Sequence, residues 1–143
     1  MSHENDDAEN SSQIRENISG AAEKNLWVDD LRTPPDGWDW AQTYSAAISL
    51  IGQHNYHTIS LDHDLADFHN ETMNHGGEIE YDAPRGWVEK TGYHVALWMV
   101  EHERYPQIVN VHTMNPVGGQ NIMRLLQSYH PLGAGAVRRV SPY

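Results

Sequence analysis

The sequence predicts a single α/β domain in which a mainly parallel sheet of about four strands is covered by helices on both faces. Short apolar runs alternate along the chain with segments whose apolar residues recur at helical spacing. This alternation is typical of a parallel sheet with helical crossovers. Polar residues follow each apolar run, which indicates that the carboxyl ends of the strands share one polar edge. The length of 143 residues suits one domain.

The predicted elements follow one another in the order βαβαβαβ. The four strands are short apolar runs at residues 25–29, 58–62, 107–113 and 134–141. The helices carry apolar side chains on one face, and we expect them between Ala41 and Gly52, from Tyr93 to Val100 and from Ile122 to Tyr129. Residues 33–40 contain two prolines and a glycine, so they predict a loop before the first helix.

Two polar segments lie outside this pattern. Residues 1–23 contain six acidic residues, one arginine and no aromatic residue, so we expect a flexible acidic tail. The folded domain should then extend from residue 24 to residue 143. Residues 65–89 form a polar, irregular connection, and connections of that length are usually functional or mobile.

The composition excludes several classes of function. Twenty acidic residues against nine lysines and arginines give a formal net charge of −11, so general DNA binding is unfavourable. The chain has no cysteine, which excludes disulfides, thiolate zinc sites and cysteine nucleophiles and is compatible with a reducing cytoplasm. No apolar run approaches the roughly 20 residues of a membrane helix, and the first residues lack the apolar core of a secretory signal. We therefore expect a cytoplasmic protein without membrane association.

Three aspartates at the ends of the first two predicted strands form a candidate metal site. Asp29 and Asp30 end the first strand, and Asp62 ends the second. Magnesium prefers one or two carboxylates together with waters and a phosphate oxygen. Close carboxylates without a cation would raise one another's pKa. Either residue of the first pair could instead cap a turn, but the set as a whole favours a divalent cation, Mg²⁺ or Mn²⁺.

Two histidines at the same edge are candidates for proton transfer. His63 follows Asp62 directly, and His112 lies at the end of the third strand. Two imidazoles that flank a phosphodiester can act as general base and general acid, each contributing about 10²–10⁴-fold. The alternatives for each histidine are a structural hydrogen bond to a neighbouring carboxylate and metal ligation.

Four more residues at this edge form a candidate substrate-binding set. The guanidinium of Arg32 suits bidentate contact with a phosphate, although it could instead pair with the neighbouring carboxylates. Thr113 and Asn115 could donate hydrogen bonds to phosphate oxygens, or they could belong to the turn before Pro116. Asp64, at the end of the second strand, either completes this set or lies at the surface.

The chain resembles the cyclic-phosphate processing receiver-like domain family in four segments, LWVDDLRTPPDGWDWAQT, SLDHDL, TGYHVALWM and VHTMNPVGGQNIM. They occur in the family's order and span nearly all of residues 24–130. The resemblance implies a receiver-like (flavodoxin-like) three-layer sandwich that processes a cyclic phosphate in a nucleotide or at an RNA end. In comparison with ordinary receivers, Asp29 and Asp30 match the acidic metal pair, and Asp62 matches the phosphoacceptor.

One departure from ordinary receivers bears on the activity. Receivers carry Lys-Pro at the end of the last strand, where this chain has Ser141 and Pro142. The difference favours a metal-assisted phosphoesterase over phosphosignalling, with His63 and His112 transferring protons and the three aspartates holding the cation. A variant of this mechanism makes Asp62 a covalent nucleophile. The alternative is a non-catalytic receiver-like module that binds a cyclic nucleotide or a protein partner.

Overall fold

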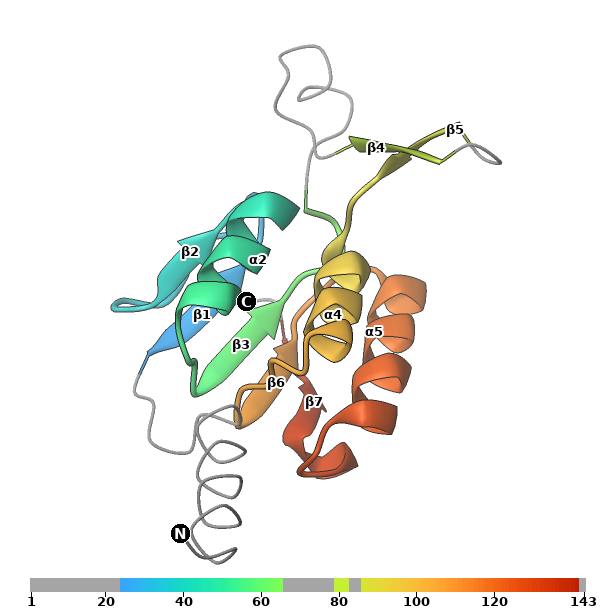
Figure 1. Ribbon diagram of the computed structural model, residues 1–143. Helices are drawn as coiled ribbons and strands as arrows, with labels where there is room; N and C mark the ends of the chain where they lie inside the picture. The colour runs from blue at the N-terminus through green and yellow to red at the C-terminus, as the bar shows by residue number, and fades with distance from the viewer. Residues whose placement is uncertain (1–23, 66–78, 83–85, 142–143) are drawn as a thin grey trace, which may run out of the picture.

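The computed structural model describes residues 24–65, 79–82 and 86–141. At its centre lies a parallel five-stranded sheet with the strand order β2-β1-β3-β6-β7 (Figure 1). The strands are β1 (Asn25–Val28), β2 (Asp39–Ala41), β3 (Thr58–Leu61), β6 (Ile108–Val111) and β7 (Val137–Arg139). This strand order is that of flavodoxin-like folds. The predicted α/β fold is confirmed, and the sheet has one strand more than the predicted four.

The additional strand, β2, lies in the segment that the sequence predicts as loop and helix start. Its residues pair in parallel with β1, from Leu26 opposite Asp39 to Val28 opposite Ala41. Ala41 is buried in the sheet and does not begin the following helix. A strand of three residues is too short to show alternation, and the prolines before it dominate the local pattern.

The three α-helices of the described residues begin at polar caps. They are α2 (Tyr44–Gln53), α4 (Gly92–Glu101) and α5 (Pro116–Tyr129). The Thr43 side chain accepts a hydrogen bond from the Ala46 amide at the start of α2, and Asn115 accepts one from the Gly118 amide at the start of α5. Helix α5 begins before its predicted apolar stripe, because Asn115 caps it and Pro116 needs no amide partner in the first turn.

The helices pack on one face of the sheet, with α4 in contact with both α2 and α5 (Figure 1). From β2 onward the chain crosses the sheet in one direction, and right-handed crossovers in one direction place their helices on the same face. Only the connection from β1 to β2 runs the other way. Within the described residues the opposite face carries no helix, so the prediction of helices on both faces is wrong there. The loop between β1 and β2 lies on that face instead, and its Trp38 ring and Arg32 carbonyl contact Trp27.

Alternation along the central strands divides the side chains between the two faces. The helix-covered face holds the buried apolar positions Leu26, Val28, Ile59, Leu61, Val109 and Val111. The opposite face holds Trp27, Ser60 and Asn110. Because the side-chain period of a strand is two residues, the positions Asp29, Asp62 and His112 continue this second face just beyond the strand ends.

The connection predicted at residues 65–89 contains a two-stranded antiparallel hairpin. Its strands are β4 (Ile79–Asp82) and β5 (Gly86–Glu89). The prediction of an irregular segment is therefore wrong at these residues. Each strand has only four residues and carries acidic groups, so neither produces an apolar run that could be recognised.

The last strand is shorter than predicted. A 3₁₀ turn at Ala134–Ala136 precedes β7, so only the middle of the predicted segment 134–141 is extended. The predicted acidic tail at residues 1–23 lies outside the described residues. Within the described residues, none of the helices combines the length and the apolar character that a membrane span requires.

Candidate functional site

The candidate site lies where the strand order reverses direction, between the carboxyl ends of β1 and β3. The chain leaves these neighbouring strands toward opposite sides of the sheet, and α/β proteins commonly bind ligands at such a switch point. Backbone hydrogen bonds extend the sheet into this edge. The amide of Asp29 donates to Ala41 at 3.0 Å, and that of Asp62 donates to Val28 at 2.9 Å. The sheet therefore fixes the backbone of both aspartates.

Asp29, Asp30 and Asp62 come together as the sequence predicts. Each offers one carboxylate oxygen such that all three atoms lie within 4.8 Å of one another. Burial raises the pKa of Asp30 to about 7, and the charge of Asp29 adds to the rise. Burial also raises the pKa of Asp62 by more than a hydrogen bond from Thr113 lowers it. Two of the three carboxyls are thus costly to ionise, and a positive charge beside them would reduce that cost.

Asp29 differs from the other two because hydrogen bonds stabilise its charge. Its Oδ1 atom accepts the backbone amides of Leu31 and Arg32, both at 2.9 Å, and its Oδ2 atom lies 2.9 Å from His112 Nε2. Burial by itself would raise the pKa of this carboxyl, but these bonds outweigh burial and lower the pKa. Asp29 is therefore the fixed negative charge of the site.

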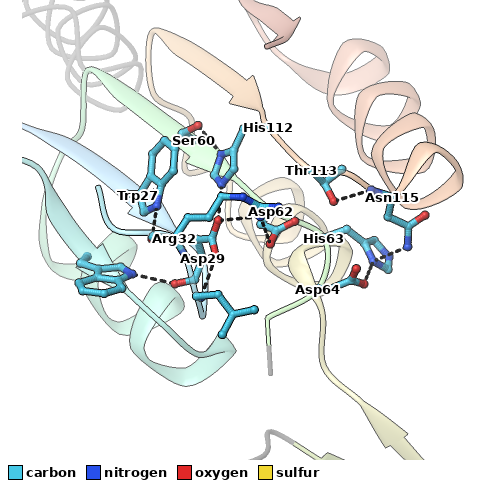
Figure 2. Close-up of polar contacts among 12 residues, drawn as sticks. Trp27, Asp29, Arg32, Ser60, Asp62, His63, Asp64, His112, Thr113 and Asn115 are labelled. Atoms are coloured by element: carbon cyan, nitrogen blue, oxygen red, sulfur yellow. Dashed lines mark hydrogen bonds and ion pairs between the residues drawn. The ribbon is translucent and has the colours of Figure 1, made fainter. Parts of the chain in front are cut away.

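His112 is fully buried behind Asp29, and both of its ring nitrogens are engaged (Figure 2). Nε2 donates to the carboxylate of Asp29, and Nδ1 accepts from the Ser60 hydroxyl at 2.6 Å. The ring also stacks on Trp27, with 3.9 Å between the centroids and 7° between the planes. This packing favours a role for His112 in holding Asp29 over direct proton transfer to a substrate.

The Arg32 side chain lies over the two buried carboxylates. Its NH1 atom is 3.4 Å from Asp29 Oδ2 and 3.5 Å from Asp62 Oδ2, and a quarter of the side chain is exposed. The Arg32 carbonyl accepts the indole N–H of Trp27 at 2.8 Å, which anchors the backbone. The guanidinium therefore places a positive charge against two of the three aspartates.

His63 lies on the other side of Asp62, against the start of α5. Its Nδ1 atom is 2.8 Å from Asp64 Oδ1 and 3.4 Å from the amide nitrogen of Asn115 (Figure 2). The shorter contact indicates that Nδ1 carries the proton and donates it to Asp64. The first turn of α5 can approach this closely because Gly118 has no Cβ, which would overlap the imidazole. About a fifth of the His63 side chain remains exposed.

Thr113 contacts both the aspartate cluster and the start of α5. Its hydroxyl accepts the Asn115 amide at 3.1 Å, and its hydrogen bond to Asp62 lowers the pKa of that carboxyl. The Oδ1 atom of Asn115 is used as the cap of α5, so its NH₂ group is the part that can face a ligand. Of the predicted substrate-binding residues, Asp64 is placed to orient His63, and its negative charge makes direct contact with a phosphate unfavourable.

Three contributors were not predicted from the sequence. Ser60 and Trp27 hold His112 from within strands, where a serine and a tryptophan carry no distinct signal. Gly92 lets the start of α4 approach the site, because its amide donates to the His63 carbonyl at 2.7 Å and a Cβ would overlap the Asp62 carbonyl oxygen. The available indication was a glycine directly before the predicted helix start at Tyr93.

Comparison with known families identifies the chain. Residues 24–128 match the profile of the cyclic-phosphate processing receiver domain. The chain belongs to this family. The match covers β1 to α5 and so includes every residue of the candidate site described above. No match was found among curated proteins or among solved structures.

Membership in the cyclic-phosphate processing receiver family agrees with the flavodoxin-like strand order. It also agrees with an acidic cluster at the switch point, next to groups that can donate hydrogen bonds to a phosphate.

Proposed function

We propose that this protein is a metal-assisted phosphoesterase that opens a cyclic phosphate in a nucleotide or at an RNA end. The observation that carries the proposal is the convergence of three carboxylate oxygens within 4.8 Å, beside the His63–Asp64 pair. Asp29, Asp30 and Asp62 would hold Mg²⁺ or Mn²⁺, whose oxygen-ligand preference they match. When bound, such a cation polarises a phosphoryl oxygen.

His63 is the residue best placed to move protons. Asp64 fixes its Nδ1–H, which leaves Nε2 as the basic atom. Opening a cyclic phosphate forms one bond between water oxygen and phosphorus and breaks one ester bond. The water loses a proton, and the departing ribose oxygen gains one. One imidazole can take the first proton and return the second, so His112 need not contact the substrate.

The phosphate oxygens would be bound by Arg32 and by the Asn115 amide group, because the one proton of the Thr113 hydroxyl is donated to Asp62. The guanidinium supplies positive charge from one side, and the start of α5 supplies hydrogen-bond donors from the other. These groups converge on the same edge as the aspartates. A ligand that carries a phosphate can thus contact Arg32 and the start of α5 at once.

The test is a turnover screen with purified protein. Its substrates are 2′,3′-cyclic and 3′,5′-cyclic mononucleotides, a cyclic dinucleotide and an RNA with a 2′,3′-cyclic end, each with Mg²⁺, Mn²⁺ or EDTA. His63→Ala should reduce turnover by about 10²-fold or more. Affinity should change much less, because proton transfer acts mainly in the transition state. The matched control is His57→Ala, since His57 precedes β3 at the opposite edge of the sheet.

Two results would refute the enzyme. If the native protein binds a cyclic nucleotide but does not open it with either metal, it is a non-catalytic receiver-like module. If His63→Ala and the His57→Ala control both turn over substrate at the native rate, His63 is structural and the proton-transfer mechanism is wrong.

A further inference from the structure

We infer that the Arg32 guanidinium exchanges between two anionic partners, the carboxylates of the site and the phosphate of the substrate. Without a divalent ion it neutralises Asp29 and Asp62, and a bound ion displaces it so that it contacts the substrate phosphate. This inference rests on the proposed function, because it concerns the same site. It explains how binding of the divalent ion would increase the affinity for phosphate.

The first observation is that a single guanidinium nitrogen bridges both carboxylates. NH1 of Arg32 lies 3.4 Å from Asp29 Oδ2 and 3.5 Å from Asp62 Oδ2. Neither distance is that of a tight two-point pairing, in which nitrogen–oxygen distances are about 2.7–2.9 Å. The guanidinium thus lies beside two buried carboxylates at distances longer than those of a tight pair, so another cation can compete for both carboxylates.

The second observation is that the ion and the guanidinium require the same oxygen. Asp29 Oδ1 already accepts two backbone amides. Oδ2 accepts from His112 at 2.9 Å and from Arg32 NH1 at 3.4 Å. A magnesium ion binds carboxylate oxygen at about 2.0–2.1 Å. Two cations cannot share this oxygen at such a distance, so binding of the ion must move the guanidinium away.

The third observation is that the Arg32 side chain can move while its backbone stays fixed. The amide is bound by Asp29 and the carbonyl by the Trp27 indole, so the residue stays anchored at the site. The side chain is a quarter exposed and has several rotatable bonds. A displaced guanidinium therefore stays at the carboxyl ends of β1 and β3, where a phosphate is its natural partner.

Exchange of this kind couples the two binding events. The ion must compete with Arg32, which weakens ion binding in the absence of phosphate. Phosphate then binds a guanidinium that the ion has released, so each ligand increases the affinity for the other. Coupling between two sites is reciprocal and typically amounts to about 5–150-fold.

The experiment measures Mn²⁺ binding by calorimetry and by the electron paramagnetic resonance signal of unbound Mn²⁺, with and without inorganic phosphate. Arg32→Gln should bind Mn²⁺ alone about tenfold more tightly than the native protein. With Mn²⁺ saturating, the same variant should bind phosphate about tenfold more weakly. Arg32→Lys keeps a positive charge and should restore most of the competition, and circular dichroism establishes that each variant is folded.

The control is Arg138→Gln, which removes the same charge from an exposed residue of β7 whose contact is with Asn110. It should leave both affinities unchanged. The inference is overturned if Arg32→Gln binds Mn²⁺ no more tightly than the native protein, or if neither protein binds Mn²⁺. Failure of the proposed function gives a different result, because Arg32→Gln would then still show tighter Mn²⁺ binding while no cyclic phosphate is opened.

Discussion

Replacement of Asp30 by asparagine should stabilise the protein when no divalent cation is present. Burial and the charge of Asp29 raise the pKa of Asp30 from 3.8 to about 7. Each pKa unit corresponds to about 1.4 kcal/mol, so this shift sets a ceiling of about 4 kcal/mol on the cost of ionising Asp30 in the folded state. Asp30 is partly exposed and water screens its charge, so we expect a gain of about 1–3 kcal/mol at pH 8.

The sign of the effect depends on pH. Below about pH 4 the carboxyl is protonated in both the folded and the unfolded chain, so it has no effect on stability. Between about pH 4 and pH 7 the folded chain binds this proton more strongly than the unfolded chain does, so stability falls as the pH rises. Above about pH 7 the difference is constant. The advantage of Asp30→Asn should therefore be small at pH 4.5 and complete at pH 8.

Urea denaturation in EDTA at pH 4.5, 6 and 8 measures this difference. The control is Asp36→Asn, which makes the same change of charge at an exposed carboxylate outside the acidic cluster. If Asp30→Asn is no more stable than the control at pH 8, or if its advantage does not grow with pH, ionised Asp30 does not lower the free energy of unfolding and the reasoning is wrong. The same variant should bind Mn²⁺ more weakly, because a ligand is lost.

Three further predictions test the supports of the site and the core. His112→Ala should weaken Mn²⁺ binding by about 10–100-fold, because it removes the hydrogen bond that holds Asp29, and calorimetry checks this. Gly92→Ala should destabilise the fold by about 1–3 kcal/mol in urea denaturation, whereas Gly52→Ala, whose Cβ has room on exposed α2, should not. Burial lowers the pKa of His130, so the unfolded chain binds a proton at this imidazole more strongly than the folded chain does. Stability should therefore fall as the pH drops below about 6.5. His130→Gln should reduce this loss of stability between pH 7 and pH 5, measured by urea denaturation.

The sequence predicts the centre of the fold because the relevant signals are local. The runs that form β1, β3 and β6 are apolar and bounded by polar residues, and parallel strands bring their carboxyl ends to one edge. That rule is sufficient to bring Asp29 and Asp62 together. Strand β2 could not be predicted, because its three residues acquire their conformation from pairing with β1.

The orientation of the site side chains depends on contacts that are distant in the sequence. His112 is held by Ser60, which is 52 residues away, and by Asp29, which is 83 residues away. Its burial and its engaged nitrogens follow from these partners and not from its own neighbours in the chain. Its position at a strand end was therefore predictable, whereas its hydrogen bonds were not.

The stacking of Trp27 on His112 gives the protein an internal optical reporter. The indole lies flat on the imidazole that holds Asp29, and its N–H is bound to the carbonyl of Arg32. An indole changes its emission when its electrostatic surroundings change, so arrival of a cation at the aspartates should alter the fluorescence of Trp27. A protein in which the other four tryptophans are replaced by phenylalanine would report occupancy without any added label. Stopped-flow mixing of that protein with Mn²⁺ would then time the arrival of the ion directly.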